Sequence, residues 1–344
     1  MALTSPDDAQ LASQLLRLIN SSWIAQACYV MARLRIADAM ASGPRGADEL
    51  AANTGAHAPS LRRLLNALCS VDLCVQRDDG TFELTPLGTL LRSDHPSSLS
   101  SWALHWGGNS WVAWGNLLHC IRTGQGTREI VVGTPGFVHL DRNPEVAAIF
   151  NQAMVQLTRL AALEVVKVYD FNGKNVMDVG GGYGELLAQV LSVYPTASGV
   201  LFDMAHAISK ARDAFAERGL AERCELVSGD FFESVPPGAD VYMLKSVIHD
   251  WPDDRAITIL KACRRAMEPD AKLLLVERMM LERLTASAQS ESIARSDLHM
   301  LVALGAQERT PAEFEVLLRA AGLATLRLIE TGGDYQIIEA GPVV

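Results

Sequence analysis

The sequence is poor in positive charge. Its 30 lysines and arginines stand against 40 aspartates and glutamates, which gives a formal net charge of −10. Nucleic acid and anionic membrane surfaces repel a chain of this charge, so we expect neither as a partner. Small molecules suit this charge balance better.

Targeting and membrane-spanning signals are also missing. The first ten residues, MALTSPDDAQ, carry acids where a secretory signal needs basic residues. No segment approaches the ~18–20 uninterrupted apolar residues of a membrane helix. We therefore expect a cytoplasmic protein.

Paired cysteines are absent too. None of the six cysteines forms a C-x-x-C pair, so we expect neither a disulfide framework nor a zinc site. Buried thiols are the remaining interpretation. The six are Cys28, Cys69, Cys74, Cys120, Cys224 and Cys263.

The length and the apolar content indicate a globular protein of two domains. The chain has 344 residues, of which 49% are apolar and 20% charged. A single core usually stops growing near ~250–300 residues, so a second domain is expected.

The N-terminal part contains a pattern typical of a winged helix. ADELAANTG (47–55) indicates a short helix that ends at a glycine, and APSLRRLLNAL (58–68) indicates a second helix with one leucine-rich face. CVQR (74–77) and TFELT (81–85) follow as two strands joined by a tight turn.

Two functions fit this winged helix. Arg62 and Arg63 on its second helix would suit DNA binding, but two arginines in an acidic chain are a poor electrostatic footprint. The preceding apolar helix, residues 11–40, is apolar over too much of its surface to be stable alone in water. We therefore favour a dimerisation platform.

The next segment holds a group of tryptophans and then a long helix. Four tryptophans fall within 13 positions, and the sequence leaves open whether they line a pocket for a flat ligand or pack a helical linker. The long helix begins with Asn143 as cap and Pro144 in its first turn, and we expect it to run to about Tyr169. The four tryptophans are Trp102, Trp106, Trp111 and Trp114.

From about residue 170 strands alternate with helices, which predicts an α/β fold with a doubly wound, mostly parallel sheet. Only the last two strands are joined by a short turn, so we expect one antiparallel pair. The predicted strands are NVMDVG (175–180), SGVLFDM (198–204), CELVSGD (224–230), VYMLKSVIH (241–249), KLLLVERMM (272–280), ATLRLIE (324–330) and YQIIEA (335–340).

A glycine turn follows the first of these strands, at the edge where such sheets bind ligands. The turn DVGGGYGE (178–185) lacks the G-x-G-x-x-G spacing of dinucleotide-binding proteins, because Glu185 occupies the last glycine position. An acid at the start of the helix would also repel a pyrophosphate. A cationic nucleoside without phosphate is therefore the better ligand.

Acids at the ends of the next two strands fit such a nucleoside. Asp203 suits the two ribose hydroxyls, while Asp230 and the neighbouring Phe231 suit the amino edge and the face of an adenine. Together, these strand ends resemble those of S-adenosylmethionine-dependent methyltransferases.

The resemblance extends over nearly the whole chain. After the winged-helix segment come DVGGGYG, GDFFESVP, LKSVIHDWPDD and GAQERTPAEF, in that order. This series resembles the small-molecule O-methyltransferases of the caffeate and isoflavone type and their bacterial polyketide-tailoring relatives. It implies a homodimer with a dimerisation domain at 1–100, a helical linker contributing to the acceptor pocket at 101–169, and a Rossmann-like catalytic domain at 170–344.

The resemblance also implies roles for particular residues. His249 corresponds to the general base, and Glu277 and Glu308 to two acids that flank it; the sequence leaves open which acid contacts the imidazole. The residues expected to bind S-adenosylmethionine are Gly180, Gly182, Asp203, Asp230, Phe231 and Lys245. Those expected to bind the acceptor are Phe150, Met154, Asp297 and His299.

Two positions depart from the family pattern. Met204 and Ala205 follow the ribose acid where Leu-Pro is common, and His299 replaces a common asparagine. The second change bears on the acceptor pocket, so the sequence does not identify the acceptor.

His249, in SVIHDWPDD (246–254), has three possible roles: a metal ligand, a structural residue or a proton acceptor. We expect no metal, because Asp253 and Asp254 follow Pro252 and suit the N-terminus of a helix. A histidine at a strand end is more often structural. However, the predicted strand 241–249 carries His249 to the same sheet edge as the cofactor motifs, where active sites of this architecture lie.

The sequence therefore predicts methyl transfer from S-adenosylmethionine to a hydroxyl, most simply a phenol, of an aromatic secondary metabolite. A neutral imidazole, with a pKa of ~6.5, would take the proton of a phenol with a pKa of ~10. Methylation of nitrogen or carbon, a relative that does not methylate, and a DNA-binding regulator are the alternatives.

Overall fold

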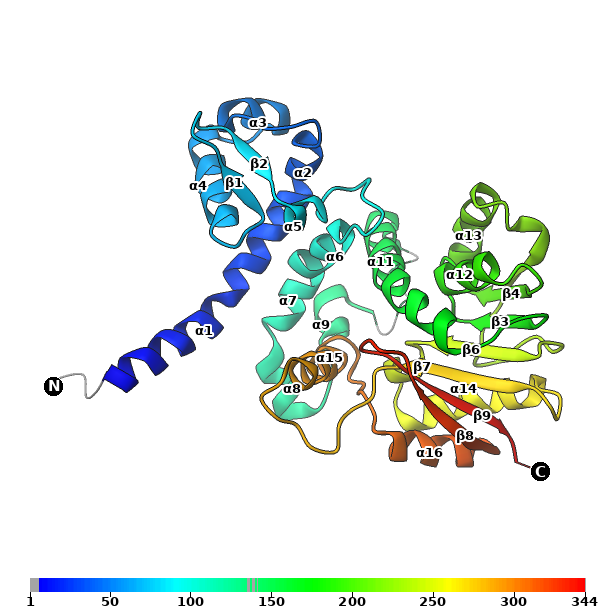
Figure 1. Ribbon diagram of the computed structural model, residues 1–344. Helices are drawn as coiled ribbons and strands as arrows, with labels where there is room; N and C mark the ends of the chain where they lie inside the picture. Colours follow the sequence, from blue (N-terminus) through cyan, green and yellow to red (C-terminus); the bar gives the residue numbers. More distant parts are fainter. Residues whose placement is uncertain (1–5, 135–136, 138–139, 141, 344) are drawn as a thin grey trace. The chain divides into compact units, whose positions relative to one another are not determined.

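The computed structural model describes residues 6–134, 137, 140 and 142–343. The chain divides into two compact units, residues 1–111 and 112–344, which we describe separately (Figure 1). The three-part division at residues 100 and 169 stays a prediction.

The first unit is mostly helical. The predicted helix over residues 11–40 is interrupted, because Arg35 adopts a left-handed conformation with φ of 52°. Its elements are α1 (Pro6–Arg33), α2 (Ile36–Ala39), α3 (Ala47–Thr54), α4 (Ala58–Cys69), β1 (Cys74–Gln76), β2 (Phe82–Leu84), α5 (Pro86–Thr89), α6 (Ser100–His105), the π-helical η1 (Trp106–Ser110) and α7 (Trp111–Trp114), the last of which reaches the boundary between the units.

The helix–helix–hairpin pattern of the first unit is confirmed. Helix α3 ends at Gly55, whose φ of 69° favours glycine. Helix α4 buries Leu61, Leu65 and Leu68 against the core, and β1 pairs antiparallel with β2. The resulting core also contains Phe82, which is fully buried.

The predicted tryptophan cluster falls in both units. Within the first unit, the rings of Trp102 and Trp106 lie 5.6 Å apart in an edge-to-face arrangement. Trp111 is 41% exposed, whereas Trp114 belongs to the second unit and stacks on His299.

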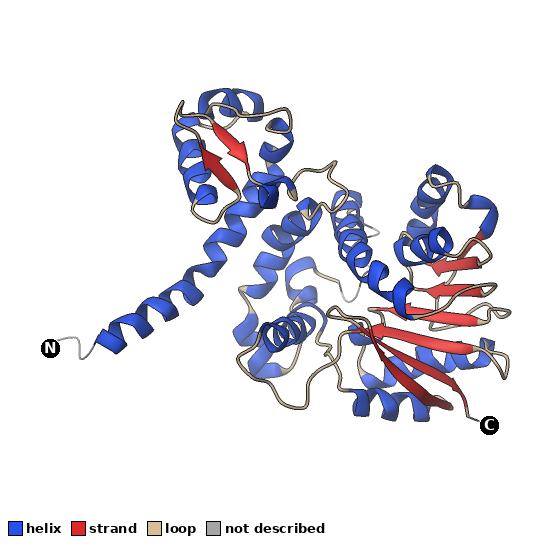
Figure 2. Ribbon diagram, in the orientation of Figure 1, coloured by secondary structure: helices blue, strands red, loops and turns tan. Residues whose placement is uncertain are grey.

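The second unit is built on a seven-stranded sheet, shown in red in Figure 2. The order β5-β4-β3-β6-β7-β9-β8 places β3 at the centre of a doubly wound parallel set, as predicted. The predicted antiparallel pair of the last two strands, β8 and β9, is confirmed. A second antiparallel pairing was not expected: β9 lies between β7 and β8 and is antiparallel to β7 as well. The strands are β3 (Asn175–Val179), β4 (Ser198–Asp203), β5 (Cys224–Ser228), β6 (Val241–Lys245), β7 (Lys272–Glu277), β8 (Leu323–Glu330) and β9 (Gln336–Pro342).

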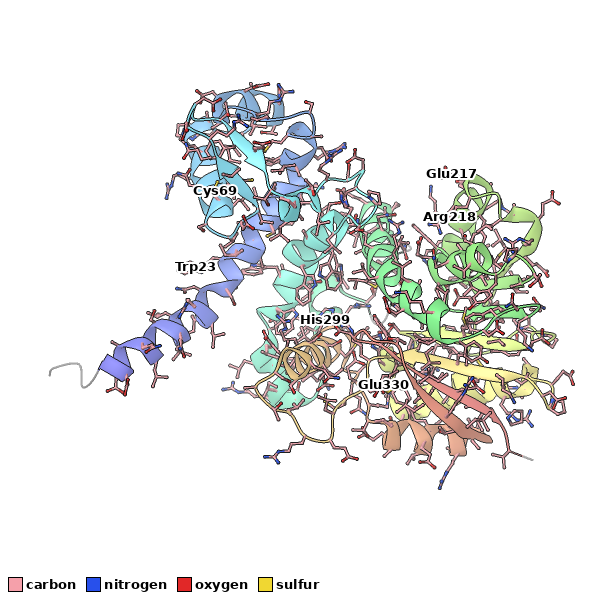
Figure 3. All side chains as sticks on the ribbon, viewed as in Figure 1. Trp23, Cys69, Glu217, Arg218, His299 and Glu330 are labelled. Atoms are coloured by element: carbon pink, nitrogen blue, oxygen red, sulfur yellow. The ribbon has the colours of Figure 1, made fainter. Side chains whose placement is uncertain are left out.

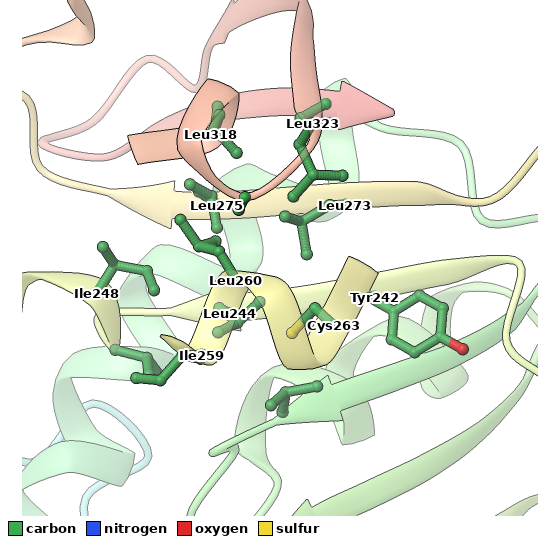
Figure 4. Packing of buried hydrophobic residues seen from close by; sticks show 14 of the residues in the cluster. Tyr242, Leu244, Ile248, Ile259, Leu260, Cys263, Leu273, Leu275, Leu318 and Leu323 are labelled. Atoms are coloured by element: carbon green, nitrogen blue, oxygen red, sulfur yellow. The ribbon is translucent and has the colours of Figure 1, made fainter. Parts of the chain in front are cut away.

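Helices cover both faces of this sheet. One apolar layer joins Leu260 and Cys263 to Leu244 and Leu275 of the strands, as Figure 4 shows. The other layer lies on the opposite face, because alternate strand residues point to opposite sides. The helices of the second unit are α8 (Leu117–Thr123), α9 (Arg128–Val132), α11 (Pro144–Val168), α12 (Glu185–Val193), α13 (Ala205–Glu217), α14 (Asp253–Ala266), α15 (Ala288–Leu304) and α16 (Pro311–Ala320), with the 3-10 turns η2 (Ala221–Arg223) and η3 (Ile248–Asp250).

Helix α11 begins at Pro144 and ends one residue before Tyr169, close to the predicted bounds. By length and composition it alone among the described helices would be able to cross a membrane, which the sequence analysis did not anticipate. It packs on α12, and its Arg159 forms an ion pair with the buried Glu185. We interpret α11 as a core helix of the second unit.

Helix α1 carries an apolar stripe that the first unit leaves uncovered. Its members recur at helical spacing and each is more than 55% exposed. Apolar surface of this extent marks an interaction site. The members are Leu11, Leu15, Leu16, Leu18, Ile19 and Trp23, the last of which is labelled in Figure 3.

We expect Ile19→Glu to weaken a homodimer that buries this stripe, because the new charge would have to lose its water. The parent should scatter light with twice the 37.2 kDa mass of the chain, and the variant should shift toward that mass at micromolar concentration. Ser13→Glu, at an exposed position off the stripe, is the control. A parent that is already a 37.2 kDa monomer would contradict the expectation.

Candidate active site

The glycine turn after β3 has the shape that a ligand requires. Gly180, Gly182 and Gly184 all have left-handed backbones, with φ of 70°, 61° and 78°. A side chain at Gly180 would place its Cβ 3.1 Å from a methyl of Val247, whereas the space beside Gly182 is open to 4 Å. The turn therefore leaves open space beside its main chain at Gly182, whereas Val247 closes the space beside Gly180.

Asp203, at the end of β4, is joined to this turn. Its Oδ2 accepts a hydrogen bond from the Gly182 amide at 2.7 Å, and its Oδ1 accepts one from the Met204 amide at 2.6 Å. Burial raises the pKa of this carboxyl despite both bonds. Each oxygen keeps a further lone pair that a ligand hydroxyl can use.

The other predicted cofactor residues occupy neighbouring strand ends. Phe231 lies beside the turn, with a ring carbon 3.4 Å from the Cβ position of Gly180. Asp230 is exposed, and its carboxylate accepts the Phe232 amide at 2.8 Å. Lys245 donates to the Thr158 hydroxyl at 3.3 Å and lies 4.9 Å above the ring of Tyr335.

The expectation that Glu185 repels anions at the start of α12 was wrong. Its carboxylate is buried and forms ion pairs with Arg159 of α11 and with Arg218, which Figure 3 labels. Because two arginines neutralise the acid, it does not present the repulsive charge that we expected at this helix start. The missing glycine of the dinucleotide spacing still stands.

His249 does not lie on a strand, contrary to the prediction. Strand β6 ends at Lys245, and Ser246 adopts a left-handed conformation with φ of 53°, which is uncommon outside glycine. The chain then turns into η3, which carries His249 in a buried position. The sharp change of direction at Ser246 places the imidazole beside the end of β7.

Three carboxylates surround the imidazole of His249. Its Nδ1 lies 3.1 and 3.2 Å from the two oxygens of Glu308 and 3.8 Å from the nearer oxygen of Glu277. Its Nε2 lies 3.4 Å from Asp250, which the sequence analysis did not assign to the site. Glu308 is therefore the acid in hydrogen-bond contact with His249, which settles the alternative left open by the sequence.

Glu277 holds the main chain that carries His249. One of its oxygens accepts the amides of Val247 and Ile248 at 3.1 and 2.9 Å. Its other oxygen is buried and has no hydrogen-bond partner among the described residues. Glu277 thus fixes the segment, while Glu308 contacts the ring.

Arg309 also fastens this segment, and sequence reasoning missed it. Its guanidinium is 1% exposed and donates to the carbonyls of Ile248 at 3.0 Å and Trp251 at 2.7 Å. It also binds the Asp253 carboxylate at 2.8 Å. Its place next to Glu308 in the sequence was the only available signal.

These contacts determine which groups carry charge. Burial lowers the pKa of His249, but the neighbouring carboxylates, Glu277 first, outweigh it and raise the pKa to about 10. Burial raises the pKa of Glu277 to about 7. For Glu308 burial acts in the same direction, yet attraction to His249 and hydrogen bonds from His249 and Ser296 hold its pKa below the usual value. The three carboxylates therefore favour the protonated imidazole, and the neutral form that we predicted for the base requires loss of that proton.

The predicted acceptor residues lie on α11 and α15. The ring of Phe150 lies 5.7 Å from that of Phe137, which in turn lies 6.4 Å from that of Trp251, so Phe150 belongs to an aromatic group with Trp251. Met154, on the same helix, is half-buried.

The two predicted acceptor residues of α15 have structural contacts. Asp297 accepts the Glu308 amide at 2.9 Å, so it holds the backbone of the acid that contacts His249. His299, labelled in Figure 3, accepts a hydrogen bond from the indole of Trp114 at 3.2 Å through its Nδ1. A proton on His299 must then reside on Nε2.

The charge cluster yields a test in the ligand-free protein. Glu308→Gln keeps the size of the side chain but removes a charge that raises the pKa of His249. We expect the imidazole to titrate in the alkaline range in the parent and closer to ~6.5 in the variant, measured by NMR of the Cε1–H group. Glu291→Gln, at an exposed position on α15, should leave the midpoint unchanged. A parent midpoint near ~6.5 would contradict the charge assignment.

Comparison with known families places the two parts of the chain. Residues 114–324 match the O-methyltransferase domain, and residues 16–94 match the O-methyltransferase dimerisation domain, which supports a homodimer. A phenazine O-methyltransferase of Lysobacter antibioticus is 43% identical over 335 residues, covering 97% of each chain. A phenazine-1-carboxylate N-methyltransferase of Pseudomonas aeruginosa is 30% identical, covering 96% of this chain and 97% of the relative.

Solved structures agree with these sequence matches. The mitomycin 7-O-methyltransferase is similar with a TM-score of 0.89 and 36% identity, covering 97% of this chain and 98% of the other. Human N-acetylserotonin methyltransferase, solved in complex with S-adenosylmethionine, has a TM-score of 0.90 and 26% identity, covering 100% of both chains. The family model spans more than half of the chain and the relatives span nearly all of it, so the protein belongs to the S-adenosylmethionine-dependent O-methyltransferases of secondary metabolism.

Proposed function

We propose that the protein methylates a hydroxyl, phenolic in character, on an aromatic small molecule, with His249 as general base. The observation that carries this proposal is the buried contact between His249 and Glu308, 3.1 Å long, at the sheet edge that also bears the glycine turn. A proton acceptor oriented by a carboxylate is the group that oxygen methylation needs and that a simple binding protein does not.

The residues around the glycine turn fit S-adenosylmethionine. Gly182 leaves open space for the amino-acid end, and we assign Gly180 to the same part of the ligand. Asp203 keeps lone pairs for the ribose hydroxyls, and Phe231 beside the turn suits the adenine. We assign Asp230 to the adenine amino edge and Lys245 to the cofactor as well. When bound, the cofactor supplies an electrophilic methyl group on a positively charged sulfur.

Within the chain, His249 moves the proton. Glu308 accepts from Nδ1, so we assign Nε2, which lies 3.4 Å from Asp250, as the atom that receives the proton of the acceptor hydroxyl. The carboxylates that raise the pKa of His249 make its neutral imidazole a stronger acceptor for the proton of a phenol. The imidazolium must first lose its own proton, and a cation bound nearby favours that loss because like charges repel.

The proposed acceptor is aromatic because of the side chains that we assign to its pocket. Phe150 and Met154 present an aromatic ring and a thioether, both suited to a flat apolar ligand. His299 is the residue that we assign to polar recognition, with Nε2 as its donor. We place the enzyme in the cytoplasm, acting on small molecules rather than on nucleic acid or membranes.

A second candidate is methylation of nitrogen, which the name of the Pseudomonas aeruginosa relative supports. A neutral ring nitrogen carries no proton to remove, so it makes no use of the His249–Glu308 pair. Incubation with labelled cofactor and a panel of phenolic, naphthoate and phenazine acceptors, read by mass spectrometry, distinguishes the two. Products labelled only on nitrogen would refute the proposed hydroxyl target.

Asp203→Asn should weaken S-adenosylmethionine binding by roughly 10–100-fold, because a hydrogen bond to a charged acceptor contributes ~1.5–3 kcal/mol. Calorimetry on the folded variant measures this directly. Asp213→Asn, at an exposed position on α13, is the matched control. Equal affinities for parent and Asp203→Asn would remove Asp203 from the cofactor site.

His249→Gln should keep the fold and the cofactor affinity yet lose roughly 10²–10⁴ in turnover, the usual contribution of a positioned proton acceptor. In the parent the rate should rise with pH as the imidazolium loses its proton; in the variant it should follow ionisation of the acceptor instead. His57→Gln, in the first unit, serves as control. Near-parental turnover of His249→Gln at pH 7 would exclude the base.

A further inference from the structure

A serine and an arginine stand behind the acid that contacts His249. Ser296, in the middle of α15, is buried and donates a hydrogen bond to Oε1 of Glu308 at 2.6 Å. The same oxygen lies 3.1 Å from Nδ1 of His249. Arg278, directly after β7, donates through Nη1 to the Ser296 hydroxyl at 3.1 Å. The three side chains form one hydrogen-bonded chain that ends on the imidazole.

We propose that Ser296 is a positioning residue that, together with Arg278, keeps Glu308 a fixed, ionised acceptor for His249. This inference rests on the proposed function, in which His249 is the base. Ser296 in this proposal affects the turnover of the enzyme and not the affinity for the cofactor.

The direction of this chain follows from the chemistry of its members. A guanidinium only donates hydrogen bonds and stays charged in proteins, so Arg278 cannot accept from Ser296. The serine oxygen therefore accepts from Arg278, and its single proton points to Glu308. Because Glu308 receives protons from both Ser296 and His249, protonating it would break a donor contact. Glu308 is thus held as an acceptor only.

Glu277 lacks such support, which separates the roles of the two acids. Its free oxygen is buried without a hydrogen-bond donor, and the nearest imidazole atom is 3.8 Å away. It can therefore take up a proton more readily than Glu308. Glu308, which contacts the imidazole ring, therefore stays ionised, whereas Glu277, which holds the main chain, can gain or lose a proton.

Charged or titratable groups on several surrounding elements interact electrostatically with this cluster. Together they determine the pH range in which His249 is neutral, and the hydrogen bond from Ser296 to Glu308 acts in addition to them. They are Glu277 and Arg278 from β7 and its end, Asp250 from η3, Arg128 from α9, Lys245 from β6, Asp297 from α15 and Tyr335 before β9.

Ser296→Ala tests the inference by removing one oxygen atom and no charge. We expect kcat to fall roughly 10–100-fold, the effect of losing a hydrogen bond to a charged group, with the acceptor KM and the cofactor affinity changed less than about twofold. Without this donor the Glu308 carboxylate should hold the protonated imidazole more strongly, so the pKa of His249 should rise. The acid limb of the pH–rate profile, which reports loss of the imidazolium proton, should therefore move to higher pH, which a purely structural role would not produce.

The matched control is Ser290→Ala, on the same helix and similarly buried. The Ser290 hydroxyl contacts Ser287 and the Thr285 amide rather than Glu308. Its kcat and pH profile should equal those of the parent, with thermal unfolding checking both variants. Parental kcat and an unmoved acid limb in Ser296→Ala would overturn the inference, as would equal losses in the two variants.

The outcome can be separated from that of the proposed function. If His249→Gln keeps parental turnover, the proposed base fails and the role of Ser296 fails with it. If His249→Gln loses turnover while Ser296→Ala does not, only the positioning inference fails. If both lose turnover and only Ser296→Ala keeps a shifted acid limb, both stand.

Discussion

A charge that is buried in a protein must be paired with an opposite charge. In the second unit this requirement applies to His249. The imidazole lies among Glu308, Glu277 and Asp250, each within 4 Å. Removing one partner from a buried ion pair commonly costs ~3–5 kcal/mol, because the other charge is left without compensation. The cluster therefore exists only while η3, the end of β7 and the residues before α16 remain in place, so the fold and the chemistry depend on the same contacts.

The sequence predicted those features that arise locally or at strand ends. Parallel strands finish at one edge, so the glycine turn and Asp203 were expected together, and the structure joins them through the Gly182 amide. The contacts of Arg309 and Ser296 were missed because they join residues 12 to 61 positions apart and depend on tertiary packing. The path of the chain after β6 was missed because a left-handed Ser246 has no sequence signature. Likewise, hydropathy does not reveal that two arginines neutralise Glu185.

The two faces of the sheet divide the tasks of the site. Leu273 and Leu275 of β7 pack in one apolar layer and Leu274 and Val276 in the other. Glu277 continues the first series and meets η3, whereas Arg278, next in the chain, contacts the Tyr335 ring and Ser296. Glu277 and Arg278 are adjacent in sequence, and alternation of side chains sends them to opposite sides. The Glu277 carboxylate thus lies beside His249, whereas the Arg278 guanidinium lies behind Ser296 and Glu308.

The segment around His249 is anchored through its main chain as well as through its side chains. Glu277 holds the amides of Val247 and Ile248, and Arg309 holds the carbonyls of Ile248 and Trp251. Ile248 is also fully buried in the apolar layer. Every amino acid except proline supplies the same amide and carbonyl groups. A substitution in this segment that keeps an apolar side chain of similar size, and is not proline, consequently leaves both sets of anchors in place.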